Sequence, residues 1–135
     1  MPGTAAAHGV AVIAEDSCFN VKVHNGVGLV APKNNNELVG RVYFPLPCPP
    51  AGCTKVNKIK IDWSGQTAIV DAVTILFGDT RKFTKNELQV TGNFNVPVGS
   101  GQATHDGRGI AVEVYIYFQN VYSNASFKSV SLIFD

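Results

Sequence analysis

The feature that most constrains the fold of this chain is a segment near its C-terminus in which apolar and polar side chains alternate. From Ile110 to Phe118, every second residue is apolar, in the series Ile, Val, Val, Ile and Phe. The residues between them are Ala111, Glu113, Tyr115 and Tyr117, and Gln119 continues this series after Phe118. Since successive side chains of a strand point to opposite faces, this alternation predicts a β-strand with one buried face and one face toward solvent.

Several other segments have the composition of strands. Shorter alternating patterns occupy residues 19–23, 59–63 and 130–134, and runs richer in apolar residues occupy 9–14, 38–46 and 67–77. The run at 67–77 is rich in β-branched residues, so we expect a strand that is buried on both faces. Residues 83–90 alone have helix character, after the candidate cap at Asp79-Thr80. Turns such as Asn25-Gly26 separate the segments, which predicts eight or nine strands.

These short strands predict an all-β chain folded as an antiparallel two-sheet β-sandwich, jelly-roll-like or immunoglobulin-like in architecture. A sandwich is favoured over a closed barrel because the alternating strands have one polar face and no evenly spaced up-and-down repeat is visible. The 135 residues match the size of one domain, so we expect residues 1–135 to form a single β-sandwich domain. Trp63 lies on the apolar side of its segment and is expected in the core.

Charge and hydropathy argue against two classes of partner. The 11 basic and 10 acidic residues nearly balance, and no basic patch indicates nucleic acid binding. No apolar run reaches about 18 residues, so we expect no membrane span. The first residues lack the basic start and apolar stretch of a signal peptide, which predicts a cytoplasmic protein. Secretion by another route and removal of a leader remain alternatives.

The three cysteines, Cys18, Cys48 and Cys53, indicate neither a disulfide framework nor a metal site. Their number is odd, although the Pro- and Gly-containing loop from Cys48 to Cys53 would allow those two to pair in an oxidising compartment. Two cysteines at this spacing, without a second pair, are a poor zinc ligand set. We therefore expect no metal and no cofactor.

Motifs of catalysis are missing from the sequence. His8, His24 and His105 are the histidines, and no G-x-S-x-G elbow or phosphate-binding loop accompanies them. We therefore assign no catalytic residue. A small enzyme with a site built from separate loops remains an alternative, because such a site leaves no local motif.

Two tyrosines on the polar face of the 110–118 strand are the first candidate binding residues. Tyr115 and Tyr117 stand beside Glu113 and Gln119 on that face. Aromatic rings stack on the C–H face of a sugar, while carboxylates and amides bond its hydroxyls. The same tyrosines also suit a subunit contact or ordinary packing across a sheet.

The loop at residues 99–109 contains the second set of candidates. His105, Asp106 and Arg108 stand together there, between glycines that allow sharp bends. Loops on a rigid sandwich often carry function. The alternative is a solvated hairpin connection with Asp106-Gly107 as its turn.

Together these features predict a non-enzymatic binding module, lectin-like, that recognises a carbohydrate or a protein surface. A structural or self-assembling sandwich protein, forming a homo-oligomer through the tyrosine face or a sheet edge, is one alternative. A small enzyme with a loop-built site is the other. A net charge of +1 would oppose self-association only weakly.

Overall fold

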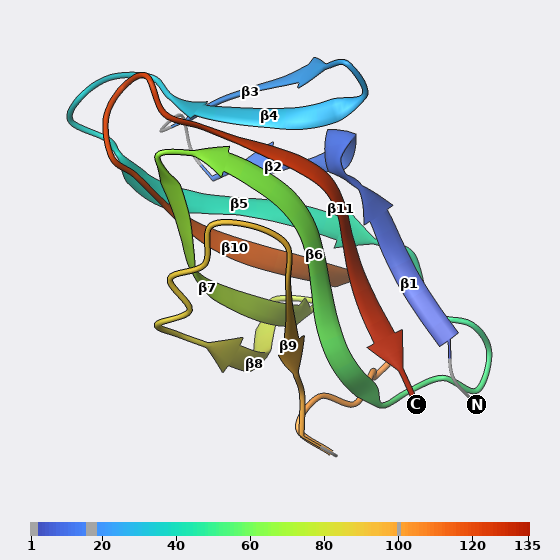
Figure 1. Ribbon diagram of the computed structural model, residues 1–135. Coiled ribbons are helices and arrows are strands. Elements are labelled where there is room, and N and C mark those ends of the chain that lie inside the picture. Colours follow the sequence, from blue (N-terminus) through green and yellow to red (C-terminus); the bar gives the residue numbers. More distant parts are fainter. Residues whose placement is uncertain (1–2, 16–18, 100) are drawn as a thin grey trace.

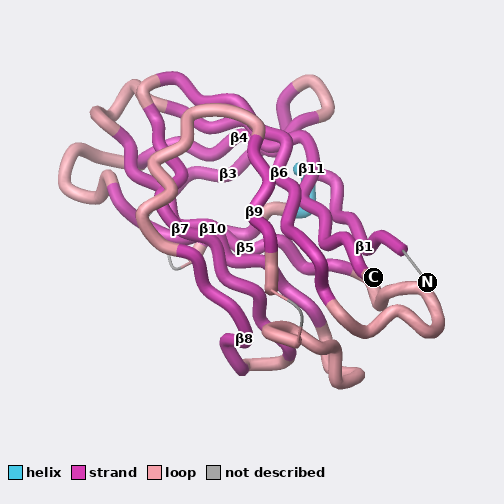
Figure 2. The backbone as a smooth tube through the Cα atoms, turned by 60° about the horizontal axis from the view of Figure 1, so that its bottom comes forward, coloured by secondary structure: helices cyan, strands magenta, loops and turns pink. Residues whose placement is uncertain are grey.

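A computed structural model describes residues 3–15, 19–99 and 101–135. Its strands form two antiparallel sheets that pack face to face (Figure 1). Apart from strands, the described residues contain one helical turn, which is cyan in Figure 2. The predicted all-β sandwich is confirmed, with eleven strands in place of the eight or nine expected.

The first sheet is built around the long C-terminal strand β11 (Asn124–Phe134). Its strand order is β3-β4-β11-β6-β9, and β1 (Gly3–His8) also pairs with β11, from Ser129 to Phe134. The other strands are β3 (Phe19–His24), β4 (Val27–Pro32), β6 (Val56–Gln66) and β9 (Phe94–Pro97). Because β1 and β11 are antiparallel partners, Gly3 lies opposite Phe134, near the C-terminus (Figure 1).

The second sheet has β10 (Ile110–Phe118) at its centre, in the order β2-β5-β10-β7-β8. Its other strands are β2 (Ile13–Ala14), β5 (Val39–Leu46), β7 (Ala68–Phe77) and β8 (Thr80–Lys85). The register aligns rows of side chains across the sheet. Tyr117 opposes Val39 on β5 and Ile69 on β7, and Tyr115 opposes Arg41 on β5.

The apolar faces of the two sheets meet in a core with aromatic rings at its centre. Trp63 stacks on Phe127 with ring centroids 5.7 Å apart, and Phe127 meets Phe44 of the opposite sheet at 5.1 Å. Branched aliphatic side chains fill the space around them: Val30, Ile59, Ile61, Val73, Ile75, Val112, Val114 and Ile116. Burial of this apolar surface stabilises the sandwich and holds β10 in place. The predicted core position of Trp63 is confirmed.

The alternation along β10 is reproduced by the structure, with one exception. Its apolar side chains face the core, while Tyr115 is half-buried and Tyr117 exposed on the outer face. Glu113 also belongs to the outer face, yet only 4% of its surface is exposed. A buried carboxylate needs compensating partners, which makes this position the starting point for the site.

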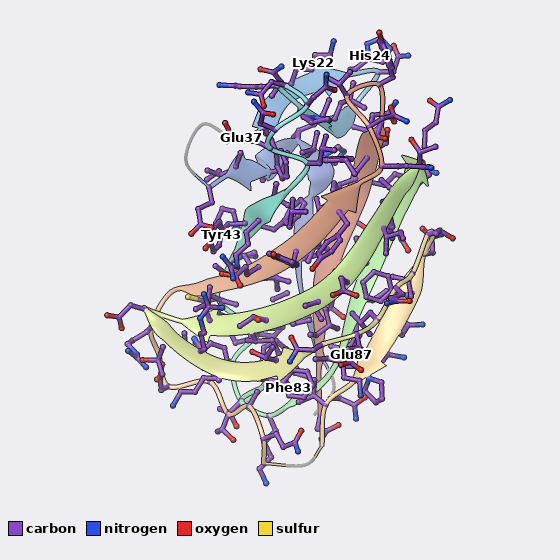
Figure 3. The ribbon with its side chains drawn as sticks, turned by 90° about the vertical axis from the view of Figure 1, so that its left-hand side faces the viewer. Lys22, His24, Glu37, Tyr43, Phe83 and Glu87 are labelled. Carbon is purple, nitrogen blue, oxygen red and sulfur yellow. The ribbon has the colours of Figure 1, made fainter. Side chains whose placement is uncertain are left out.

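The prediction of a helix at residues 83–90 is wrong. Residues 80–85 form β8, which pairs with β7, and Phe83 packs against the core. Beyond β8, Glu87 and Gln89 have positive φ angles of 57° and 48°, which no α-helix contains. Figure 3 shows Phe83 and Glu87 at the opposite end of the view from Lys22 and His24. Tertiary pairing with β7 has overridden the weak local preference.

Three strand predictions need correction. Residues 9–14 contain a 3-10 turn, η1 (Gly9–Ala11), followed by the two residues of β2. The valines at 21 and 23 are exposed because β3 is an edge strand. The strand at 67–77 is not buried on both faces, since Ile69 is 37% exposed on the outer side.

Strands β1, β4 and β9 were not predicted from the sequence. β1 has the sequence GTAAAH, whose alanines give little hydrophobic contrast between its faces.

Of the three cysteines, Cys18 lies outside the described residues, while Cys48 is exposed and Cys53 is buried. The part of the chain that the structure describes contains no helix with the length and apolarity of a membrane-spanning segment.

Candidate functional site

A groove of about 400 Å³ lies on the outer face of the second sheet. We call it the tyrosine groove and define it by Arg41, Arg81, Glu113, Tyr115 and Tyr117, which come from β5, β8 and β10. The rest of its lining consists of Asp71, Ala72, Thr74, Thr84 and Asn86. The groove therefore crosses the sheet and brings together side chains that are distant in sequence.

Tyr115 and Tyr117 are neighbours on the same face of β10, as their spacing predicts. Their ring centroids are 5.3 Å apart and their planes meet at 68°, an edge-to-face arrangement. Val39, Ile69 and Tyr117 form one row across three strands, and each is between 37% and 42% exposed. This row is a flat apolar surface open to solvent.

Arg41 ties the tyrosine pair to the charged part of the groove. Its guanidinium carbon lies 4.9 Å from the centroid of the Tyr115 ring, the geometry of a cation–π contact. Its Nε atom lies 3.4 Å from Glu113 Oε1, and its Nη1 atom lies 3.6 Å from Glu15 Oε2. Arg41 is thus held on three sides, which restricts both its own rotamers and those of Tyr115.

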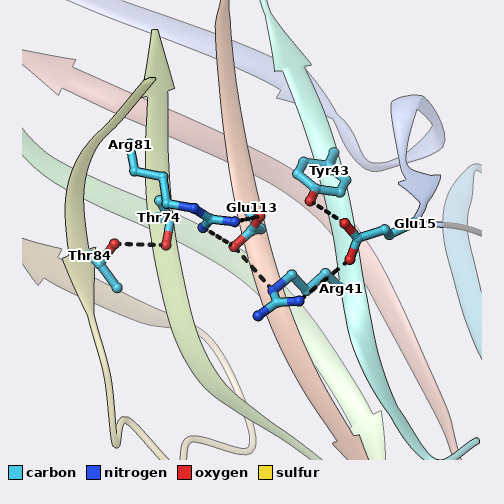
Figure 4. A network of polar contacts seen from close by, with 7 residues as sticks. All are labelled: Glu15, Arg41, Tyr43, Thr74, Arg81, Thr84 and Glu113. Atoms are coloured by element: carbon cyan, nitrogen blue, oxygen red, sulfur yellow. Dashed lines mark hydrogen bonds and ion pairs between the residues drawn. The ribbon is translucent and has the colours of Figure 1, made fainter. Parts of the chain in front are cut away.

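Glu113 is the centre of the charged network (Figure 4). Arg81 donates two hydrogen bonds to it, from Nη1 to Oε1 at 2.6 Å and from Nη2 to Oε2 at 3.0 Å. This bidentate pairing is the strongest geometry available between a guanidinium and a carboxylate. Since both arginine side chains are half exposed, they keep donors for a ligand while Glu113 is compensated.

The network fixes the ionisation of the groups around Glu113. Burial raises the pKa of Glu113, but the hydrogen bonds from Arg81, the nearby Tyr43 hydroxyl and the charges of both arginines outweigh it, so the net pKa lies below its ordinary value. The Tyr43 hydroxyl donates to Glu15 Oε1 at 3.0 Å. Burial, then the neighbouring carboxylates of Glu113 and Glu15, raise the pKa of Tyr43 well above its usual range. At neutral pH Glu113 is therefore ionised, and Tyr43 beside it is protonated.

Two guanidinium groups and two carboxylates balance in this network, so its formal charge is zero. Two hydroxyl groups line the same groove, where Thr74 and Thr84 share a hydrogen bond of 3.0 Å. A neutral ligand with many hydroxyl groups matches such a surface better than a strongly charged one.

Gln119 lies on a second groove, of about 470 Å³, which adjoins the first at Tyr117. We call it the apolar groove and define it by Ala68, Ile69, Tyr117, Phe118 and Gln119. The backbone of its wall is anchored, because Gln119 N donates to Thr67 O at 2.9 Å. The predicted set Glu113, Tyr115, Tyr117 and Gln119 thus extends over two adjoining grooves.

The structure does not bring His105, Asp106 and Arg108 to the tyrosine groove. Their loop, orange in Figure 1, precedes β10, whereas Tyr117 is near the end of that strand. A strand of this length spans roughly 25 Å, so the two candidate sets are far apart.

The groups of this loop are largely occupied by one another. Arg108 donates to Asp106 Oδ2 from Nη2 at 2.8 Å, and its backbone N–H donates to Oδ1 at 3.1 Å. These bonds from Arg108 lower the pKa of Asp106 to about 2. His105 bonds the carbonyl of Arg108 through Nε2 at 2.7 Å. The loop is thus internally hydrogen-bonded, but it is not the hairpin of the alternative interpretation, because it joins β9 of the first sheet to β10 of the second.

Arg41 and Arg81 were missed at the sequence level. Arg41 alternates with the apolar residues of β5, and this alternation would have placed it on the outer face. Arg81 falls just before the stretch that was expected to be helical, so its pairing with Glu113, 32 residues away, had no local signal.

Within residues 3–15, 19–99 and 101–135, no three His, Cys, Asp or Glu side chains gather as a metal site would require. The tyrosine groove itself offers two aromatic rings and the hydrogen-bonding groups of its polar side chains.

No protein-family model matches the sequence, and no curated protein matches it. Solved structures match the fold. A low-affinity xylan-binding module, CBM86, from Roseburia intestinalis is 12% identical with a TM-score of 0.60, over 98% of this chain and 96% of that one. A CBM36 carbohydrate-binding module in complex with calcium and xylotriose is 12% identical with a TM-score of 0.51, over 93% and 96%.

The same fold also occurs outside the carbohydrate-binding modules. A Stig cyclase from Fischerella sp. TAU is 12% identical with a TM-score of 0.50, over 98% of this chain and 74% of that one. At such identities the similarity shows a common sandwich fold alone, because one fold hosts unrelated functions.

Proposed function

We propose that this protein is a non-enzymatic, lectin-like carbohydrate-binding module whose sugar lies in the tyrosine groove. The observation that carries the proposal is the pair of Tyr115, half-buried, and Tyr117, exposed, beside a fixed set of hydrogen-bonding groups on one sheet face. The carbohydrate-binding modules with the same fold, two of them associated with xylan or xylotriose, support it.

In this proposal each part of the groove has its own role. The tyrosine rings supply apolar surface for the C–H face of a sugar ring. Arg41 and Arg81 donate hydrogen bonds to hydroxyl oxygens with the N–H groups that Glu113 leaves available. Because Glu113 already fixes both guanidinium groups, little side-chain entropy is lost when a sugar binds.

The test is binding of the labelled protein to a broad glycan array that includes xylo-oligosaccharides. We expect specific binding to at least one glycan family. The double variant Tyr115→Ala/Tyr117→Ala should lose at least about tenfold in affinity, because buried aromatic contacts dominate binding energies. Circular dichroism confirms that the variant is folded.

Two further variants serve as matched controls. Tyr122→Ala removes a tyrosine that is 87% exposed and lies outside both grooves, and Arg108→Ala alters the loop at the other end of β10. Both should bind like the wild type. An array without binding by folded protein, or binding that survives the double variant, contradicts the proposal.

Self-association is a second candidate function, favoured by the exposed row of Val39, Ile69 and Tyr117. A second copy of the chain would cover these side chains as a sugar does. Tyrosine is enriched at protein interfaces, and the low net charge leaves little repulsion between copies.

A further inference from the structure

The apolar groove differs in chemistry from the tyrosine groove that it adjoins. None of the residues that line it carries a charge, whereas the tyrosine groove has Arg41, Arg81, Asp71 and Glu113. Tyr117 lines both, so a single ligand can pass from one to the other across this ring. A polar half and an apolar half, joined at one aromatic side chain, indicate a ligand with two unlike halves.

The apolar groove is built from anchored backbone. Phe118 N donates to Leu38 O at 2.7 Å, and Gln119 N donates to Thr67 O at 2.9 Å. Ile69 stands on the neighbouring strand opposite Tyr117, and both are exposed. The groove is thus formed before any ligand arrives, and its exposed surface is an aliphatic side chain beside an aromatic ring.

We infer that the ligand is an amphipathic glycoside, whose sugar lies in the tyrosine groove and whose flat apolar aglycone lies against Ile69 and Tyr117. The inference rests on the proposed function and names the class of its ligand. A phenyl ring is a chemical probe of that class. It would cover Ile69 and the side of Tyr117 that the sugar leaves open.

A further sugar unit fits the apolar groove less well. Each hydroxyl that enters a groove must exchange its water for a protein partner, and an unpaired one weakens binding. Besides the Tyr117 hydroxyl, the polar side chains that line this groove are Gln119 and two threonines. The hydroxyl of Thr67 already bonds the carbonyl of Gln66 at 2.7 Å. An aromatic ring makes no such demand.

The test compares two ligands that share one sugar, methyl β-D-xyloside and phenyl β-D-xyloside, by titration calorimetry. We expect the phenyl glycoside to bind at least about tenfold more tightly, because even one methylene in an apolar pocket contributes about that factor. Ile69→Thr should remove most of this advantage. Ile69→Val is the matched control, because valine has nearly the same shape as threonine but is apolar. This variant should keep the affinity advantage of the phenyl glycoside.

Two results would overturn the inference. Equal affinity for the methyl and phenyl glycosides means that no aglycone site exists. An affinity advantage of the phenyl glycoside that persists in Ile69→Thr means that no aglycone site exists against Ile69. Xylotriose and the array glycans, titrated into the same samples, separate this failure from that of the proposed function. If xylotriose or an array glycan binds but the phenyl glycoside has no affinity advantage, only the proposal of an aglycone site is wrong. If no sugar binds, both proposals are wrong.

Discussion

Glu113 shows what alternation predicts at a single residue and what it leaves out. The period of two places this residue on the outer face of β10, which is where it lies. Its burial depends on Arg41 of β5 and Arg81 of β8. No local sequence pattern reveals that these two arginines pair with Glu113. The shared face of Tyr115 and Tyr117 and their proximity follow from their spacing alone, whereas the contact of Arg41 with Tyr115 had no local signal.

Replacing Glu113 tests the network directly. Glu113→Gln removes the carboxylate of Arg81 and one of the two that Arg41 contacts, and we expect a loss of about 1–3 kcal/mol in the free energy of unfolding at pH 7. Chemical denaturation measures this loss. Glu37→Gln, at an exposed glutamate, is the matched control and should change stability by less than about 0.5 kcal/mol.

The sign of the pH dependence follows from the lowered pKa of Glu113. A carboxyl whose folded-state pKa is depressed stabilises the protein above its unfolded-state pKa, and this contribution is lost as pH falls through the folded-state value. The stability difference between wild type and Glu113→Gln should therefore be largest above about pH 5 and shrink in more acidic solution. A difference that stays constant down to pH 3 would mean that the network does not act through ionised Glu113.

At the scale of elements, the predictable strands are those with contrast between their faces. β10 and the C-terminal part of β11 alternate clearly and were predicted. β1 lacks contrast, and β8 has a mixed sequence that its pairing with β7 decides. Local sequence carries only part of the information, because a strand is stabilised by neighbours that are distant in the chain.

The junction of η1 with the first sheet depends on two glycines. A Cβ atom on Gly9 would overlap the carbonyl of Phe127, and one on Gly28 would overlap the carbonyl of Gly9. We expect Gly9→Ala to lower the free energy of unfolding by about 2 kcal/mol or more, because the backbone of β11 must move. Gly92→Ala adds a methyl group in open space and is the matched control. Equal denaturation midpoints for the two variants would contradict this packing.

At the scale of the whole molecule, the sandwich separates two surfaces that the sequence made equally plausible. The tyrosine groove lies on the outer face of the second sheet, while the loop with His105, Asp106 and Arg108 lies beyond the start of β10. Fold class could be predicted because strand patterns and turns are local. The separation of the two candidate binding sites could not be predicted, because strand order and register determine where each site lies.

Sedimentation velocity distinguishes the two candidate functions at this scale. We expect a monomer, because three half-exposed side chains cover far less than the roughly 800 Å² per partner of a stable interface. A concentration-dependent dimer that disappears in Tyr117→Ala would instead favour self-association through this face.

The most direct test of the central claim is to map a bound sugar onto the backbone by NMR. Xylotriose, or a tighter glycan from the array, is titrated into ¹⁵N-labelled protein and the amide shifts are followed. The proposal predicts that the largest shifts occur at Arg41, Arg81, Glu113, Tyr115 and Tyr117. Shifts confined to the 101–109 loop or to the first sheet would contradict it, because the sugar would then bind away from the tyrosine groove.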